Sequence, residues 1–300
     1  MENIIEDIKP AEAPPFQLLK EIQTQAATDA DTSTRNIIIN SKRNLPWFQE
    51  IPEFQKVKGK DKKIALIGGG PSIEKYVDDI KQFKTTMVCG SPNDWAMKNG
   101  IVPTYSVICD PDPISVNYFQ KLDTETRYML ATCCDPKIFD HILKGNNKQV
   151  IMWHCHSYDA EERLKAANAD VKYHYALGGG CTVGLRALSM AISMGYSNIH
   201  MFGYDSCLGE NDKHHAYDFS DASEELGKIY KIKIGGFEKP DDDSRTFHCA
   251  GYQLAQAEHF RTFFQQYYNI FTPTIYGDGL IAEFIKRANK EAKKIVGVAA

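Results

Sequence analysis

The stretch that decides the fold reads Lys62-Lys63-Ile64-Ala65-Leu66-Ile67-Gly68-Gly69-Gly70-Pro71-Ser72-Ile73. An apolar strand runs directly into three glycines, and a proline and a serine then open a helix. Glycine allows a sharp turn and lets a ligand approach the backbone closely. Pro71 suits the first turn of a helix, because that position needs no N–H donor. Free N–H groups at the start of a helix bind anions, so the stretch predicts a nucleotide or phosphate site.

Strand-like and helix-like segments alternate after this stretch. Apolar strands are predicted at residues 64–67, 86–90, 105–109, 128–132, 149–154 and 198–202. Helices are predicted between them, at residues 73–83, 94–99, 114–122, 136–143, 160–167 and 182–194. Continuous apolar strands separated by helices are typical of a parallel sheet that is covered on both faces. We therefore predict an α/β, Rossmann-like, doubly wound fold with a mostly parallel sheet.

The chain is predicted to have three parts. Residues 1–60 form an N-terminal extension with a helix at 16–27 and an aromatic arm that packs on the main body through Trp47, Phe48, Ile51 and Phe54. Residues 61–205 form the nucleotide-binding core. Residues 206–300 form a lid insertion and the closing helix, strand and helix of the same domain, at 253–267, 269–275 and 280–294. The lid is expected at 206–248, because long polar segments without regular structure are lids or binding loops.

Composition narrows the class of protein. The 300 residues are 43% hydrophobic and 25% charged, with a net charge of −4, as in an ordinary globular protein. No long basic run is present, so a nucleic-acid partner is not expected. No apolar run is long enough to span a membrane, and no signal peptide is recognised. The eight cysteines are scattered, and four of them lie in apolar strand-like runs, namely Cys89, Cys109, Cys133 and Cys155. This favours buried thiols and a reducing, cytoplasmic location.

A second glycine-rich turn has the same features as the first, namely glycines and a hydroxyl residue before a helix. Gly178-Gly179-Gly180-Cys181-Thr182 precedes the helix at 182–194, and Thr182 adds a hydroxyl to the N–H groups of the helix start. Two such turns in one parallel sheet predict a ligand with two ends, such as a nucleotide and its activated group. An alternative for either turn is a tight connection that binds nothing.

Polar side chains follow other strands at the same predicted edge. Asn93 is predicted to bind a base or ribose, with helix capping by Asn93 or Asp94 as the alternative. Asp110 is predicted to bind the nucleotide or a Mg²⁺ ion, whereas Asp112 has helix capping as its alternative. The predicted nucleotide ligands are Gly68, Gly69, Gly70, Ser72, Asn93, Asp110, Gly179, Gly180, Thr182 and Asp205, with Asp110 also the metal ligand.

Histidines supply the acid–base chemistry. His214 and His215 are the most concentrated source, and imidazole transfers protons near neutral pH. Neighbouring side chains of an extended segment point apart, so one of the two is predicted to act. Tyr217 is predicted to donate to a leaving phosphate, and His248 is a reserve base beside Tyr252. The alternative is a solvated loop without chemistry.

His154-Cys155-His156 has the spacing that puts two imidazoles on one face of a strand. No carboxylate cluster completes a metal site nearby. A structural or pocket-lining role is therefore predicted in preference to zinc binding.

These sites, in this order, resemble the 6-hydroxymethylpterin diphosphokinase MptE-like family. The resemblance covers roughly residues 62–220. It rests on Gly-Gly-Gly-Pro-Ser at 68–72, Lys-Asn-Gly-Ile-Val-Pro-Thr-Tyr at 98–105 leading to Asp110-Pro111, the glycines at 178–180, and Met-Gly-Tyr-Ser-Asn-Ile-His-Met-Phe-Gly-Tyr-Asp at 194–205.

The layout also resembles bacterial sialyltransferases and the motility-associated nonulosonic-acid transferases, with likeness reaching 214–218 and 253–268. These families imply a Rossmann-like fold with CMP or an ATP-like donor beside the glycines. In the sialyltransferases a histidine is the general base, and tyrosines neutralise the leaving phosphate without a metal. The chain departs from that pattern at Gly69, where asparagine is normal, and His248 and Tyr252 compete for the position of the histidine.

The leading hypothesis is a transferase with a nucleotide-activated donor, most specifically a sialyltransferase-like glycosyltransferase. One alternative is Mg²⁺-dependent pyrophosphate transfer from ATP to a pterin-like alcohol, as the family name implies. Another is a nucleotide-binding protein without catalysis. The expected partners are a nucleotide or nucleotide-sugar donor and a hydroxyl acceptor, and self-association is left open.

Overall fold

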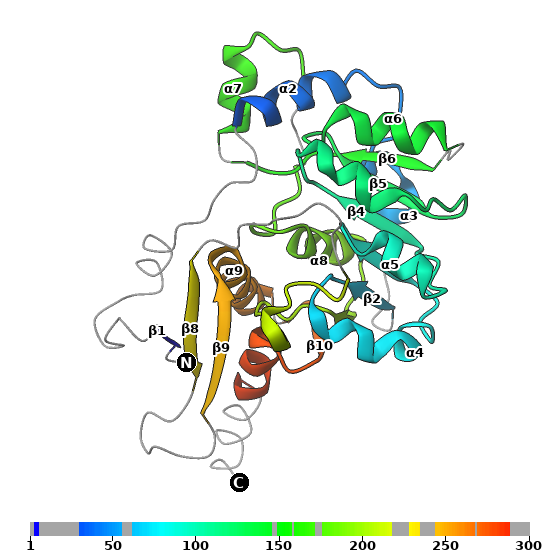
Figure 1. The fold of residues 1–300 in the computed structure, drawn as a ribbon. Helices are drawn as coiled ribbons and strands as arrows, with labels where there is room; N and C mark the ends of the chain where they lie inside the picture. The colour runs from blue at the N-terminus through cyan, green and yellow to red at the C-terminus, as the bar shows by residue number, and fades with distance from the viewer. Residues whose placement is uncertain are drawn as a thin grey trace.

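The computed structural model describes residues 3–5, 30–55, 62–145, 149–157, 159–171, 176–217, 228–234, 244–267 and 269–288. Its centre is a seven-stranded parallel sheet with the strand order β10-β7-β2-β3-β4-β5-β6 (Figure 1). The strands are β2 (Lys63–Ile67), β3 (Thr86–Cys89), β4 (Tyr105–Ile108), β5 (Arg127–Ala131), β6 (Val150–Trp153), β7 (Asn198–Phe202) and β10 (Thr272–Tyr276). The predicted α/β, Rossmann-like fold and its strands are confirmed.

Helices follow the strands as predicted, although two of them are tighter than an α-helix. The segment after β2 is a 3-10 helix, η2 (Pro71–Tyr76), that continues into α4 (Val77–Ile80), and the segment after β4 is η3 (Pro113–Phe119). The other helices of the core are α5 (Asn93–Lys98), α6 (Pro136–Lys144), α7 (Ala160–Ala166), α8 (Val183–Ser193) and α9 (Gly251–Tyr267), with a further helix over 280–288. Within the described residues, no helix is both long and apolar enough to cross a membrane.

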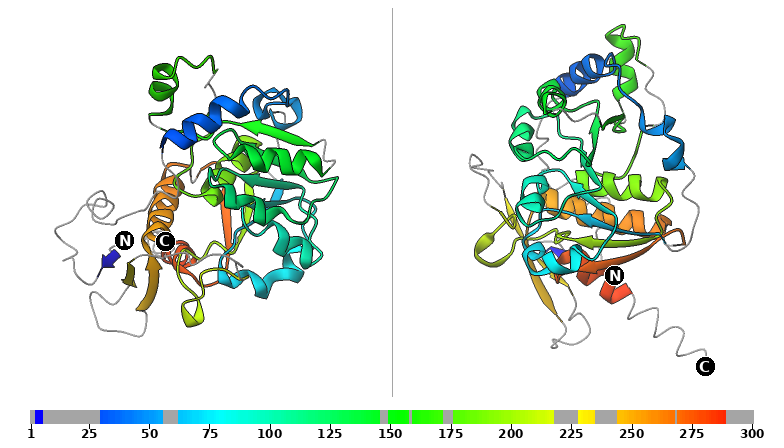
Figure 2. Two further views of the ribbon diagram at one scale, coloured as in Figure 1. Left: turned by 45° about the horizontal axis from the view of Figure 1, so that its top comes forward. Right: turned by 90° about the vertical axis from the view of Figure 1, so that its right-hand side faces the viewer.

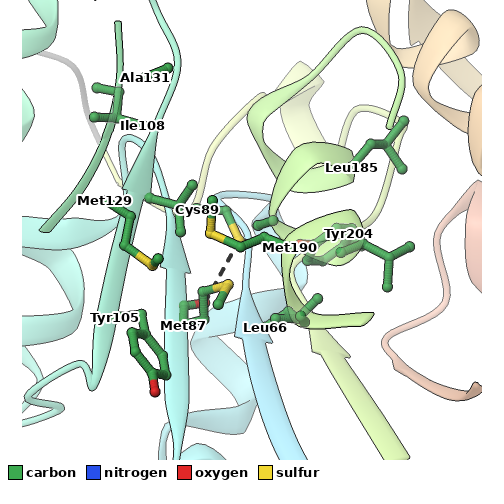
Figure 3. Close-up of a cluster of buried hydrophobic side chains, with 14 of the residues drawn as sticks. Leu66, Met87, Cys89, Tyr105, Ile108, Met129, Ala131, Leu185, Met190 and Tyr204 are labelled. Atoms are coloured by element: carbon green, nitrogen blue, oxygen red, sulfur yellow. Dashed lines mark hydrogen bonds between the residues drawn. The ribbon is translucent and has the colours of Figure 1, made fainter. Parts of the chain in front are cut away.

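Both faces of the sheet are buried. Ile64 and Leu66 of β2 belong to the larger apolar cluster, which includes α8, and the alternate residues Ala65 and Ile67 belong to the smaller cluster with η2 and α5. Figure 3 shows part of the larger cluster, where Met190 of α8 lies over the sheet. Each β2 side chain is less than 1% exposed from Ile64 on, which explains why the strand has no polar alternation.

The strand order creates a switch point. The chain runs outward from β2 through β3, β4, β5 and β6, and then returns to place β7 on the other side of β2. Open α/β sheets bind ligands outside the carboxyl ends of the strands at such a point. The segments that begin at Gly68 and Gly203 therefore occupy the favoured position for a ligand.

The segment expected to be an irregular lid contains regular structure. Strands β8 (Ile229–Ile234) and β9 (Arg245–Ala250) form an antiparallel hairpin, and β1 (Asn3–Ile5) pairs with β8. The hairpin lies beside α9, separate from the parallel sheet (Figures 1 and 2). Burial alternates along β8, because Tyr230, Ile232 and Ile234 face the core. The prediction of an irregular segment is wrong for these residues. Residues 218–227 and 235–243 of the segment lie outside the described residues, and its lid role stays a prediction.

The aromatic arm packs as predicted. The arm includes η1 (Phe48–Glu50) and α3 (Pro52–Gln55). Phe48 and Phe54 are buried, and Trp47 bridges to Met152 of β6. Helix α2 (Ala30–Asn40) is also attached to the core, since Asn40 donates to the carbonyl oxygens of Thr132 and Cys134 at 2.9 and 2.8 Å. The helix predicted at 16–27 lies outside the described residues.

Candidate functional site

The first glycine turn is a junction between β2 and β7. The N–H of Gly68 donates to Phe202 O at 2.8 Å, that of Gly70 to Gly203 O at 2.9 Å, and that of Ser72 to Asp205 Oδ2 at 3.0 Å. These three N–H groups were predicted to bind a phosphate, and in the structure they bind the protein itself. The helix that follows is 3-10 and short. The predicted phosphate cradle is therefore not formed at this turn.

Asp205 closes the junction. Its side chain is 6% exposed, and burial raises the pKa of its carboxyl group above the usual value, although the Ser72 N–H opposes the shift. The N–H of Leu280 donates to its carbonyl oxygen at 2.8 Å, which attaches the end of β10 as well. The hydroxyl of Ser72 is buried beside Gly277, with no hydrogen-bond partner among the described residues. Ser72 and Asp205 thus connect the segments that follow β2, β7 and β10. Both residues were predicted to bind a nucleotide, and in the structure both have a structural role.

Two predicted catalytic side chains lie over this junction. His215 Nδ1 is 3.2 Å from Gly69 O, and the Tyr217 hydroxyl is 2.7 Å from Ser91 Oγ. A Cβ atom at Gly69 would lie 2.8 Å from His215 Nδ1, so the turn needs glycine there because these side chains cover it. A carbonyl oxygen only accepts hydrogen bonds, so His215 Nδ1 donates in this contact.

His214 joins the same group. Its ring lies 3.8 Å from that of His215 and 5.3 Å from that of Tyr252, centroid to centroid. The prediction that the two histidines point apart is wrong, because the chain bends at residues 215–217 instead of remaining extended. Two imidazoles and two phenols therefore meet beside the switch point.

The second glycine turn has a different form. Gly179 and Gly180 have φ values of 131° and 96°, which L-residues with side chains rarely adopt. Thr182 then caps α8, since its hydroxyl accepts the N–H of Leu185 at 3.4 Å. The first N–H groups of α8 have no partner within the helix, and α8 is long enough for its dipole to favour an anion. The geometry predicted for an anion site is present here, and its role stays a prediction.

The two turns lie at one edge of the sheet. Ser206, next to Asp205, donates to Gln256 Oε1 at 2.9 Å, and Gln256 Nε2 donates to Thr182 Oγ1 at 3.1 Å. A Cβ atom at Gly90 would lie 3.0 Å from Val183 Cγ1, and Gly90 precedes Ser91, the partner of Tyr217. Val183 at the start of α8 therefore lies against Gly90, which is one residue along the chain from Ser91, the partner of Tyr217.

Asn93 does not face this edge. It is fully buried, its amide donates to Lys121 O at 3.0 Å, and its amide oxygen accepts the Ser106 hydroxyl at 3.0 Å. Its predicted role as a nucleotide ligand is therefore wrong. The capping alternative is also wrong, because Asp94 accepts the N–H groups of Gln120 and Lys121 at the end of η3, and no side chain caps α5.

Asp110 and Asp112 form turns instead of a metal site. Asp110 Oδ1 accepts the N–H of Asp112 at 3.0 Å, and Asp112 caps η3 through the N–H of Ile114 at 2.9 Å, which confirms the capping alternative for Asp112. Throughout the described part of the chain, no three His, Cys, Asp or Glu side chains form a group that could hold a metal ion. The residues present therefore do not fit a protein-built Mg²⁺ site.

His248 lies apart from the candidate site. It is exposed on β9, opposite Lys231 of β8, on the outer face of the hairpin. Its predicted use as a reserve base does not agree with this placement. His154 is buried with Nδ1 2.7 Å from Thr132 Oγ1, and His156 is exposed, so the two imidazoles do not share a face and His154 has the structural role predicted for it.

One face of α9 was missed. Tyr252, Gln256 and His259 are spaced by four and three residues, so they share a helix face. Gln256 reaches Thr182, and His259 lies against Gly180. The apolar spacing of α9 could be read from the sequence. Tyr252, Gln256 and His259 stand between the apolar residues at helical spacing, and this spacing was the signal for a second face of the helix.

Comparisons with known proteins identify a family and a similar fold. A family model described as 6-hydroxymethylpterin diphosphokinase MptE-like matches residues 35–211, more than half of the chain. Among solved structures, the chain is similar to the MAf glycosyltransferase from Magnetospirillum magneticum AMB-1, with 14% identity and a TM-score of 0.58. The match covers 83% of this chain and 36% of that one, so the chain spans about a third of that protein.

Two weaker likenesses concern sialyltransferases. A mammalian sialyltransferase matches with 10% identity and a TM-score of 0.43, over 87% of this chain and 84% of that one. The sialyltransferase CstII from Campylobacter jejuni, in complex with the substrate analogue CMP-3FNeuAc, matches with 16% identity and a TM-score of 0.33, over 75% and 85%. A comparison with curated proteins gave no match. At 14% identity, the likeness to the MAf glycosyltransferase shows the fold alone.

Proposed function

Because the chain belongs to the 6-hydroxymethylpterin diphosphokinase MptE-like family, we propose that it is a transferase with a nucleotide-activated donor, and that the transferred group is a sugar. One observation carries the proposal: Val183 at the start of α8 lies against Gly90, and the next residue, Ser91, bonds to Tyr217, so the start of α8 and the group of His215 and Tyr217 lie at the same edge of the sheet. Transfer with a phosphate leaving group needs an anion site beside a base. The glycosyltransferase that shares the fold supports the choice of a sugar by analogy.

The phosphate of the donor binds at the start of α8, held by the backbone at Gly179 and Gly180 and by the hydroxyl of Thr182. His215 Nε2 takes the proton of the acceptor hydroxyl, with His214 as the alternative base. The acceptor oxygen then bonds to the sugar carbon, whose bond to the phosphate oxygen breaks, and Tyr217 donates a hydrogen bond to the departing phosphate. His215 and Tyr217 lie over the junction of β2 and β7, which is formed by Gly68, Gly70, Ser72 and Asp205.

Pyrophosphate transfer from ATP is the second candidate, because the family is named for it. That reaction needs Mg²⁺ beside the phosphates. Asp110 is the nearest predicted ligand, and the described residues hold no group of three ligating side chains around it. Mg²⁺ held by one carboxylate and the phosphates of ATP does not require such a group, so a test of metal dependence separates the two candidates. Activity that EDTA abolishes and Mg²⁺ restores would favour the diphosphokinase instead.

The proposed phosphate site has a direct test at Gly178. This residue is exposed, and a Cβ atom there meets nothing within 4 Å. Gly178→Asp adds a negative charge before α8 without a clash, and Gly178→Asn is the neutral control of the same shape. Titration calorimetry with CMP, CDP, UDP, ATP and GDP should find a nucleotide that binds the wild type and the Asn variant alike. The Asp variant should bind it about five- to tenfold more weakly.

Two other outcomes separate the candidates. If none of the five nucleotides binds the wild-type protein, the proposal is wrong. If a nucleotide binds tightly but no transfer to any hydroxyl acceptor is detected, and substitution of His214 and His215 changes nothing in the cell, the chain is a nucleotide-binding protein without catalysis.

A further inference from the structure

The polar face of α9 carries two buried atoms without a hydrogen-bond partner. Tyr252, Gln256 and His259 lie on this face, and α9 packs against α8 (Figure 1). Within the described residues, the Tyr252 hydroxyl and His259 Nδ1 are both buried and have no hydrogen-bond partner. An unpaired polar group is unfavourable in a protein interior, so both atoms are candidates for contact with a ligand.

Gln256 lies between these two residues and is fully paired. Its Nε2 donates to Thr182 Oγ1 at 3.1 Å, and its Oε1 accepts the Ser206 hydroxyl at 2.9 Å. These bonds connect the polar face to the start of α8. The lack of a partner is therefore specific to Tyr252 and His259 and does not extend to the whole face.

His259 faces the second glycine turn. A Cβ atom at Gly180 would lie 3.1 Å from His259 Cβ and 3.3 Å from His259 Nδ1, so the edge of the imidazole that carries Nδ1 lies against the turn. The turn leads through Thr182 into α8, whose first N–H groups have no partner within the helix. A group bound at this turn would therefore lie between the start of α8 and His259 Nδ1.

The groups around His259 favour an anion. Burial lowers the pKa of His259 below its usual value, with Glu258 opposing the shift and Arg186 of α8 adding to it, so the ring is neutral at pH 7. Glu258 forms an ion pair with Arg261 on its own helix. In the turn, burial raises the pKa of the Cys181 thiol to about 11, so this thiol is neutral as well. Arg186 has no acidic partner among the described residues, and its positive charge acts on the turn.

We propose that His259 binds the phosphate group of the donor, with Nδ1 donating a hydrogen bond to a phosphate oxygen at the second glycine turn. His259 would thereby complete the phosphate site proposed above, on which this inference rests. A phosphate oxygen accepts the hydrogen bond that Nδ1 lacks, and Arg186 and the start of α8 both favour its negative charge. His259 is thus assigned to binding, whereas His214 and His215 stay the candidate bases.

Bound phosphate should change the titration of His259. A neighbouring anion stabilises the imidazolium form, so phosphate should raise the pKa of His259. The test uses the full chain and inorganic pyrophosphate, which carries phosphate groups without a base or a sugar. Proton NMR follows the histidine rings at several pH values, and the His259 signal is identified by its loss in His259→Asn. Pyrophosphate should shift this signal and raise the pKa, whereas the signal of His248, on the exposed face of β9, should not move.

Two substitutions separate a hydrogen bond from packing. His259→Leu removes Nδ1 and should weaken pyrophosphate binding by at least about tenfold, as expected for a lost hydrogen bond to a charged group. His259→Asn keeps an N–H donor in the place of Nδ1 and should restore most of the affinity. Titration calorimetry measures both, and thermal melting checks that both variants are folded. If His259→Leu is unfolded, the ring titration of the wild type decides alone.

Three results would overturn the assignment of His259. They are no binding of pyrophosphate at millimolar concentration, no shift of the His259 signal when pyrophosphate is bound, and equal affinity of His259→Leu and the wild type. The proposed function fails in a different way. If pyrophosphate acts on His259 but none of the five nucleotides binds, His259 belongs to an anion site and the proposed transfer is wrong. If a nucleotide binds and His259 has no effect on it, the transfer proposal stands and the role of His259 is wrong.

Discussion

The two glycine turns look alike in sequence and differ in use. The turn at Gly68–Gly70 donates its N–H groups to the carbonyl oxygens of β7 and to Asp205, and it ends in a short 3-10 helix. The turn at Gly178–Gly180 reverses the chain with two positive φ values and ends at a capped α-helix of 11 residues. The first turn forms the junction beneath the proposed base, His215. The second turn is the proposed phosphate site.

We expect a glycine-rich turn before a helix to bind an anion only if its N–H groups have no partner elsewhere in the fold. At the first turn, the return of β7 beside β2 supplies those partners. At the second turn, no hydrogen bond from the N–H groups of Gly178, Gly179 or Gly180 is formed among the described residues. The two turns are therefore expected to have separate roles.

The largest effect is expected at the base. His215→Gln should lower kcat by about 10²- to 10⁴-fold, because a general base contributes that much, while the dissociation constant for the nucleotide stays the same. His248→Gln, on the exposed face of β9, is the control and should keep full activity. The measurement is steady-state kinetics with calorimetric binding. A loss of nucleotide affinity in His215→Gln would mean that the first turn also holds the donor.

The next effect concerns packing at the first turn. In Gly70→Ala, the new Cβ atom would lie 2.7 Å from Gly203 O and still closer to Asp205 Oδ2, which should cost about 3 kcal/mol of unfolding free energy. Gly178→Ala has open space and should change the unfolding free energy by no more than about 0.5 kcal/mol. Urea denaturation measures both. If Gly70→Ala and Gly178→Ala have the same unfolding free energy, the first turn is not more closely packed than the second.

A smaller effect is expected at the cap of α8. Thr182→Val removes the hydroxyl that accepts from Leu185 and Gln256, and it should lower the unfolding free energy by about 1 kcal/mol. It should also weaken nucleotide binding, because the start of α8 loses its order. Thr182→Ser keeps a hydroxyl and should restore both properties. If Thr182→Val binds the nucleotide as tightly as the wild type, the hydroxyl has no part in the donor site.

The smallest effect is expected at Asp205. Burial raises the pKa of its carboxyl group above 3.8 in the folded state, so the folded chain keeps that proton to a higher pH than the unfolded chain does. The resulting stabilisation is complete below the unfolded pKa and is lost as the pH rises through the folded pKa. Asp205→Asn keeps an acceptor for the Ser72 N–H and cannot ionise. Its unfolding free energy should equal or exceed that of the wild type at pH 7 and should be less dependent on pH in the acid range.

Much of the fold could be predicted because its signals are local. The apolar strands and the helix cap at Asp112 both follow from neighbours in the sequence. The site could be predicted only in part, because the partners of Gly70, Ser72 and Asn93 come from distant segments. The period-two pattern of β8 was also available, but the polar residues around it hid the strand.

The most direct test of the separate roles is hydrogen–deuterium exchange with saturating nucleotide, read on the peptides that cover residues 178–186 and 63–73. We predict that the nucleotide slows exchange of the first amides of α8, while the amides at Gly68, Gly70 and Ser72 exchange slowly with or without it. Protection that appears at 63–73 and not at 178–186 would contradict the account.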